Sequence, residues 1–200
     1  MSRRWRKMSS GFGLKNAIMN ESEIATIEKL DQVGSFTIWT DLQGFVERLG
    51  WTGSIPSAAQ FEVLGNLEFL RAIFIENYFG RVREPIDEIL IEILLRNTKL
   101  HVLGIAYIPF LPNATIAFQE NDSIECLRLQ GCSLKNEDLL PIGTMKRLKY
   151  LNIFNNPQLE LGAMNSLLEK CCLDRVYIDN KESFVGELAT RFKHTHFEFK

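Results

Sequence analysis

The chain has 200 residues, of which 46 % are hydrophobic, and its formal net charge at neutral pH is −2. This length and apolar content suffice for one sizeable core, so a single domain is expected. A charge so close to zero gives no electrostatic reason to expect nucleic acid or an anionic membrane as a partner. The four cysteines include no CxxC pair and there are three histidines, so we expect a reduced intracellular protein with no metal site and no cofactor.

The N-terminal segment, residues 1–20, is basic and is expected to be flexible. Its first fifteen residues contain no acidic side chain and lack the apolar core of a secretory signal. We therefore expect a cytoplasmic protein. Mitochondrial targeting segments share the basic, acid-free composition of this segment, so a mitochondrial accessory protein is an alternative.

Apolar residues at helical spacing predict helices along the chain. The second of these stripes, within residues 42–49, is flanked by a capping box of Thr40 and Gln43 and by Gly50, a residue typical of helix C-termini. The predicted helical stripes, in chain order, are Ile24, Ile27 and Leu30; Leu42, Phe45, Val46 and Leu49; Ile86, Ile89, Leu90, Ile93 and Leu94; Leu161, Met164, Leu167 and Leu168; and Phe184, Leu188 and Phe192.

A phrase of alternating apolar residues recurs between the later stripes. It reads LHVLGIAYIPF from Leu100, IECLRLQGCSL from Ile124, LKYLNIFNNPQL from Leu148 and LDRVYIDNK from Leu173, in steps of 24, 24 and 25 residues. The alternation predicts strands with one buried face, unlike the strands of a doubly wound sheet, which are buried on both. A strand–helix–strand crossover of a doubly wound sheet also takes about 30 residues or more, which is longer than the steps of 24 and 25 residues seen here, so a doubly wound sheet is not favoured. Weaker strands are predicted at 33–38, 70–75 and 197–199.

The period and the pattern L-x-x-L-x-L-x-x-N/C-x-L resemble those of leucine-rich repeat proteins, clearly over residues 100–181 and irregularly over 21–99. Cys132 and the following LKNEDLLPI resemble the cysteine-containing subtype, which occurs in substrate receptors of ubiquitin ligases. The resemblance implies one α/β solenoid domain over residues 21–200. Parallel strands would form its concave face and helices its convex face, after a helical N-terminal cap that ends near residue 60.

The resemblance also assigns a role to the residue in the N/C position, whose side chain bonds to backbone in the turn after the strand. Cys132 and Asn156 occupy this position in two successive units. In the third unit the position is taken by Lys181, which is not expected to make such a bond, and this predicts that the repeat frame breaks down near the C-terminus.

In this frame, positions three, five, seven and eight of each phrase face outward on the concave side. The outward set is rich in aromatic residues and arginine, the residue types enriched at protein–protein hot spots. A plainer interpretation is that the N-terminal region or the ends of the sheet cover some of these aromatics. We favour a non-enzymatic module that binds another protein. We do not expect it to bind nucleic acid or a membrane. The predicted partner-binding residues are Phe74, Tyr107, Arg128, Tyr150, Asn152, Phe154, Arg175 and Tyr177.

No catalytic motif is present, since the chain lacks a GxxxxGK[ST] phosphate loop, a GxSxG elbow and an HExxH pair. Two other functions are weighed against protein recognition. One is a thiol- or histidine-dependent activity of Cys126 or of His194 and His196. The other is an adaptor or substrate receptor of a ubiquitin ligase, because residues 85–95 resemble the opening of an F-box.

Overall fold

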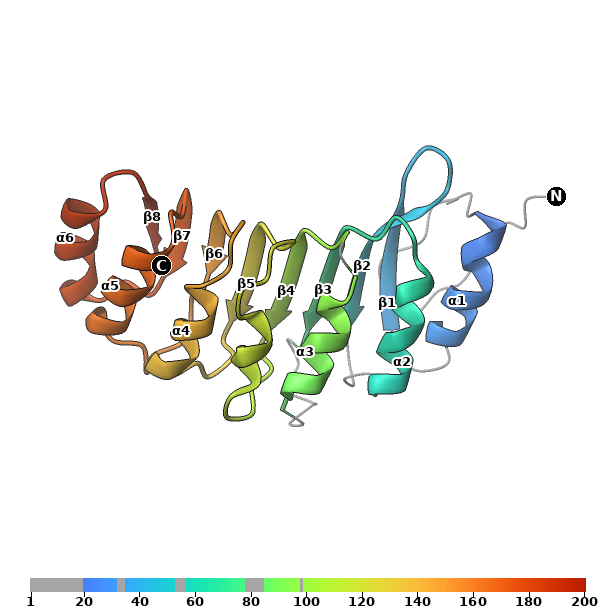
Figure 1. The fold of residues 1–200 in the computed structure, drawn as a ribbon, viewed down its shortest axis with the longest axis horizontal. Coiled ribbons are helices and arrows are strands. Elements are labelled where there is room, and N and C mark those ends of the chain that lie inside the picture. The colour runs from blue at the N-terminus through green and yellow to red at the C-terminus, as the bar shows by residue number, and fades with distance from the viewer. Residues whose placement is uncertain (1–19, 32–34, 53–56, 78–84, 98) are drawn as a thin grey trace.

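Eight strands form one open sheet, in the order in which they occur along the chain (Figure 1). The computed structural model describes residues 20–31, 35–52, 57–77, 85–97 and 99–200. The first two strands are antiparallel and every later neighbouring pair is parallel. The strands are β1 (Ser35–Thr40), β2 (Val46–Thr52), β3 (Ala72–Glu76), β4 (Val102–Ala106), β5 (Cys126–Gln130), β6 (Tyr150–Asn152), β7 (Arg175–Ile178) and β8 (His196–Phe199).

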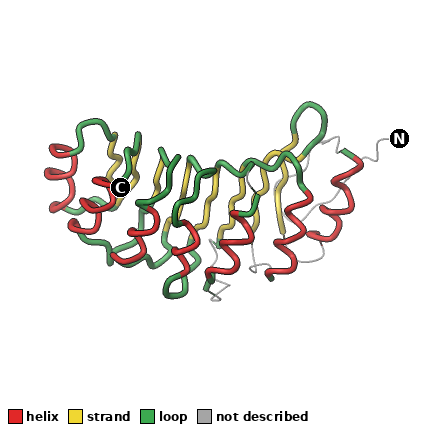
Figure 2. Tube along the Cα trace, in the orientation of Figure 1, coloured by secondary structure: helices red, strands yellow, loops and turns green. Residues whose placement is uncertain are grey.

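Helices alternate with the parallel strands and lie along one side of the sheet, as Figure 2 shows in red against the yellow strands. The fold is therefore mixed α/β, and its sheet does not close on itself. None of the helices in the described ranges is both long and apolar enough to cross a bilayer. The helices are α1 (Glu21–Asp31), α2 (Ala58–Glu62), η1 (Val63–Asn66), α3 (Glu88–Leu95), η2 (Ala114–Phe118), η3 (Asn136–Asp138), α4 (Leu139–Ile142), α5 (Leu161–Lys170) and α6 (Glu182–Arg191).

The core lies between the sheet and these helices. Each central strand contributes an apolar residue to one buried row that runs across the sheet in register, and burying each such side chain stabilises the fold by about 1.5–3 kcal/mol. The stripes predicted for α5 and α6 pack on the same core. The row consists of Ile73, Leu103, Leu127, Leu151 and Val176, all at most 1 % exposed.

The helix predicted over residues 42–49 is wrong, because this segment forms a β-hairpin of β1 and β2. Asp41 directs the turn: its carboxylate accepts two backbone N–H groups of the turn, each at 2.9 Å. Gly44 follows with a φ of 87°, which glycine adopts without a steric penalty. Leu42, expected to face the core, is fully exposed. The turn-forming residues thus override the helical spacing.

The hairpin also changes two expectations for the N-terminal region. A wholly helical cap is wrong, since α1 is followed by two strands before α2 begins. The strand predicted over residues 33–38 pairs antiparallel instead of parallel. The predictions for residues 1–19 and for Val33 lie outside the described residues.

The helix predicted after Pro85 forms, but it begins later than expected. Asp87 caps α3, since its Oδ1 accepts the N–H of Leu90 at 2.8 Å. Ile89 is exposed and Ile91 is buried, so the buried side of α3 differs from the predicted stripe at these two residues. Ile86, expected on the helix, lies outside it in an isolated bridge.

The turn after β6 is fixed by the buried side chain of Asn156. Its amide group donates to the carbonyls of Leu129 at 2.9 Å and Ile153 at 2.8 Å. Its Oδ1 accepts the N–H of Cys132 at 3.1 Å and of Leu134 at 3.0 Å. All four hydrogen-bonding positions of the amide are therefore used, three of them toward β5 and the turn after it, and one within the turn of Asn156 itself.

The neighbouring N/C positions also bond to backbone. The thiol of Cys132 donates to the carbonyl of Ile105 at 3.3 Å, as its position in the pattern predicts. Lys181 was not expected to bond to backbone in this way, and this is wrong. Its long side chain reaches back one unit, so that Nζ donates to the carbonyls of Pro157 at 2.8 Å and Leu159 at 2.6 Å. The Lys181 ammonium group is only a donor, so it bonds to carbonyl groups alone, whereas the Asn156 amide bonds to both carbonyl and N–H groups.

Candidate functional site

The side of the sheet opposite the helices is called the open face below. Its side chains come from alternate strand residues and form rows in register across the strands. One row contains Trp39, Arg48, Ala72, Val102, Cys126, Tyr150, Arg175 and His196. The neighbouring central row contains Thr37, Gly50, Phe74, Gly104, Arg128, Asn152, Tyr177 and Glu198.

The open face brings most of the sequence-predicted binding residues together. Two of them, Tyr107 and Phe154, lie just past the ends of β4 and β6. The others occupy the two rows, with Phe74, Arg128, Asn152 and Tyr177 in the central row and Tyr150 and Arg175 beside it.

Glycines in the central row leave space for aromatic rings from neighbouring strands. A Cβ atom on Gly104 would lie 2.5 Å from Cδ1 of Phe74, so the ring occupies the space over that residue. Gly50 similarly has the Trp39 ring 3.3 Å from its Cβ position. Trp39 remains 49 % exposed, and it extends the predicted set toward β1.

The centre of the open face is held by a network around Arg128. Its Nη1 donates to Oε1 of Glu76 at 2.9 Å, and its Nη2 donates to Oε1 of Gln130 at 2.7 Å. Gln130 in turn donates to the Tyr107 hydroxyl at 2.5 Å. The ion pair spans from β5 to β3 and crosses β4, which explains why Ala106 is buried although its position predicts exposure. Arg128 and Tyr107 are thus fixed by other side chains of the same face.

Three other residues of the predicted outward set are also buried: Gly104 of the phrase from Leu100, and Ala72 and Asn77 of the weaker strand that begins at residue 70. Ala72 is too small to reach past its neighbours Arg48 and Val102 in the same row. A short side chain can therefore be buried even when it points to the open face of the sheet.

The C-terminal part of the face, over β6 and β7, is more accessible. Tyr150 is 42 % exposed. Arg175 is also exposed and lies 3.6 Å from Glu198 and 3.4 Å from the Tyr177 hydroxyl. Asn152 accepts the backbone N–H of Phe154 at 3.1 Å, which fixes the chain where it leaves β6. These residues form a mixed aromatic and cationic surface on a rigid backbone.

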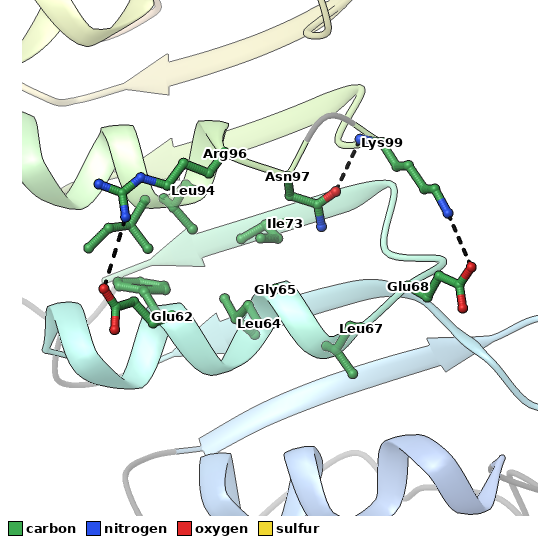
Figure 3. Close-up of a pocket in the computed structure, with 12 residues that line it drawn as sticks. Glu62, Leu64, Gly65, Leu67, Glu68, Ile73, Leu94, Arg96, Asn97 and Lys99 are labelled. Atoms are coloured by element: carbon green, nitrogen blue, oxygen red, sulfur yellow. Dashed lines mark hydrogen bonds and ion pairs between the residues drawn. The ribbon is translucent and has the colours of Figure 1, made fainter.

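A hollow of about 410 Å³ lies on the helix side, between α2–η1 and α3 (Figure 3). Apolar core side chains form its floor, including those of Leu64 and Leu94. Its charged rims pair with each other: Arg96 lies 4.0 Å from Glu62, and the Lys99 ammonium lies 3.5 Å from Glu68. Because its charges are already paired, this seam between helices offers little to orient a ligand.

The geometry gives no support to a thiol–histidine activity. Burial raises the pKa of the Cys126 thiol, against a smaller opposite effect of Arg128, so less thiolate is present at neutral pH. His196 lies three strands away in the same row, about 14 Å at the usual strand spacing. Within the described ranges, no three His, Cys, Asp or Glu side chains are grouped to hold a metal ion.

The segment that resembles the opening of an F-box is part of the core. Leu90, Ile91, Ile93 and Leu94 of α3 are buried, and Ile89 is the exposed apolar residue of that helix.

Comparison with known proteins adds no relative: no family model matches this chain, and no curated protein matches it.

Proposed function

We propose that this chain is a leucine-rich repeat solenoid that binds another protein through the open face of its sheet, without catalysis. The solenoid assignment is supported by strands that follow one another in register at 24-residue steps. It is supported further by side chains such as Asn156 that bond to the backbone of the preceding unit. In this proposal the open face is the concave one.

The observation that carries the binding role is an accessible ring beside a cation and a second ring. Tyr150 is 42 % exposed on β6, next to Arg175 in the same row and close to Tyr177, whereas the exposed Trp39 lies five strands away. A ring that is about half exposed has on the order of 100 Å² left to bury, which stabilises a complex by about 2–3 kcal/mol. Tyrosine and arginine are enriched together at the hot spots of protein-binding surfaces.

Within the open face, we assign the main anchor to the part over β6 and β7, formed by Tyr150, Asn152, Phe154, Arg175 and Tyr177. The central Arg128–Glu76 ion pair has already used its charges internally. Arg175, by contrast, lies 3.6 Å from Glu198 at a position open to solvent, where such a pair contributes little and a partner carboxylate can compete.

The test is capture of a partner by the protein and by two double variants. Tyr150→Ala with Tyr177→Ala removes two rings of the anchor and is expected to weaken capture by at least about thirtyfold, from about 2 kcal/mol or more of lost burial. Ile116→Ala with Leu140→Ala is the matched control, because both side chains are exposed on helical elements. Equal capture by all three proteins would refute the proposed face.

No structural observation favours the ubiquitin-ligase alternative, since the apolar side chains of α3 serve the core. The mitochondrial alternative depends on residues 1–19, which lie outside the described residues. Protein recognition by the open face is therefore the single function that we propose.

A further inference from the structure

A separate hollow of about 350 Å³ lies on the open face where β3 and β4 begin. Its floor is low because the row here has short side chains, Ala72 and Val102, and the Phe74 ring forms one wall. The hollow is large enough for one or two amino-acid side chains, at the lower end of the range for ligand pockets. Arg48, Arg71 and His101 line it as well.

The two arginines of this hollow differ from the other arginines of the described ranges. The other five each have an acidic partner within 4.0 Å: Arg96, Arg128, Arg147, Arg175 and Arg191. Arg48 and Arg71 form no such ion pair with any described residue, although Glu47 also lines the hollow. Two arginines against one glutamate, Glu47, leave the lining of the hollow with an excess of positive charge, which attracts an anion.

Side chains, and not backbone N–H groups, are left to recognise an anion in this hollow. Phosphate sites commonly use several converging backbone N–H groups. Here those groups are already engaged: the N–H of Arg71 donates to the backbone carbonyl of Glu47 at 2.8 Å, and the N–H groups of His101 and Val102 donate to the Arg71 carbonyl at 2.9 and 3.0 Å. A guanidinium fork matches a carboxylate and a phosphate alike, so the apolar part of the hollow decides between a peptide carboxylate and a free anion.

The apolar part of the hollow defines the rest of the ligand. Phe74 and Val102 lie beside the cationic rim and can cover an apolar side chain adjacent to the acidic one. The ring of His101 is held at the rim, because its Nδ1–H donates to the carbonyl of Ser123 at 3.1 Å. A free anion would leave this apolar surface uncovered, whereas a peptide with adjacent acidic and apolar residues fills both parts.

We propose that this hollow binds an acidic side chain of the partner protein, an aspartate or glutamate next to an apolar residue. The carboxylate bonds to Arg48 and Arg71, and the apolar neighbour packs on Phe74 and Val102. This inference rests on the proposed role of the open face in protein recognition, and it adds the chemistry of the segment that the partner presents.

The test is an NMR titration of the full-length protein that needs no natural partner. The probes are the blocked dipeptide acetyl-phenylalanyl-aspartyl-amide, its asparaginyl counterpart and inorganic phosphate, all at one ionic strength. The arginine side-chain Nε–H signals report on Arg48 and Arg71. We expect saturable shifts of both signals with the aspartyl probe, which should bind about tenfold or more tightly than the asparaginyl probe.

Variants locate the site. Arg71→Gln should weaken binding of the aspartyl probe by about tenfold or more. Arg96→Gln, which changes a paired arginine on the helix side, should leave binding unchanged. Equal binding of the two peptides, equal or tighter binding of phosphate, or unaltered binding to Arg71→Gln would each overturn the proposal. Since no partner is used, these results are independent of the capture test on Tyr150 and Tyr177.

Discussion

Asn156→Ala removes a fully buried side chain with four hydrogen bonds of 3.1 Å or less, three of which join the turn after β6 to β5 and to the turn that follows β5. A net contribution of about 1 kcal/mol for each bond gives about 4 kcal/mol. The N–H groups of Cys132 and Leu134 also lose their acceptor in the interior, which adds a desolvation cost unless water enters the space left by the side chain. We expect the free energy of unfolding to fall by about 3–5 kcal/mol.

The assay is urea denaturation followed by circular dichroism, with the unfolding free energy taken from midpoint and slope. Asn180→Ala is the matched control, because Asn180 lies 24 residues further on and is exposed. That variant should change the unfolding free energy by less than about 0.5 kcal/mol. Amide exchange of Cys132 and Leu134 should accelerate in the Asn156 variant. A loss below about 1.5 kcal/mol would refute the reasoning that this side chain holds the turns together.

Three further changes test other parts of the structure. Gly104→Ala places Cβ 2.5 Å from Cδ1 of Phe74, so unfolding should become about 1 kcal/mol easier, and a double-mutant cycle with Phe74→Ala should remove that cost; additive effects would contradict the contact. Gly131→Ala combines a φ of 64° with a Cβ position 2.7 Å from Cδ1 of Tyr107, and should cost about 1–3 kcal/mol in urea unfolding, whereas a neutral result would contradict the strain. Burial raises the pKa of the Glu23 carboxyl, so the folded state binds this proton more tightly than the unfolded state, and the Glu23 contribution to stability falls as pH rises from about 4.3 through the raised value. Glu23→Gln should remove that fall from the stability–pH curve, and parallel curves for both proteins would contradict it.

The strands over residues 100–181 could be predicted because their apolar residues alternate and the steps between them are nearly constant. The burial of β4 on both faces could not, because it depends on the Phe74 ring over Gly104 and on the ion pair that crosses the strand. The hairpin at 35–52 could not, because its residues also satisfy a helical spacing. There the turn geometry of Asp41 and Gly44 decides the structure, and the apolar pattern does not reveal this competition. Lys181 was misjudged for a related reason, since side-chain length lets it reach carbonyls that a short polar residue could not.

The open-face residues could be predicted from strand alternation, which correctly places Phe74, Arg128 and Tyr150 on one side of the sheet. Their interactions could not, because the Arg128–Glu76 ion pair joins residues 52 positions apart and depends on exact strand register. The hollow beside Arg48 was hidden for the same reason. Its lining requires β2 to pair with β3, and the helix expected over residues 42–49 excluded that pairing.

We propose that the open face over β6 and β7 binds another protein. Quantitative affinity capture with mass spectrometry, from cells that express the protein, tests it most directly when three forms are compared: the unaltered protein, Tyr150→Ala with Tyr177→Ala, and Ile116→Ala with Leu140→Ala. The account predicts that one or more proteins are captured by the first and third forms and are lost from the second, with similar thermal unfolding of all three. Retention of the same proteins by the Tyr150 and Tyr177 variant, or their loss from the helix-side variant alone, would contradict the account.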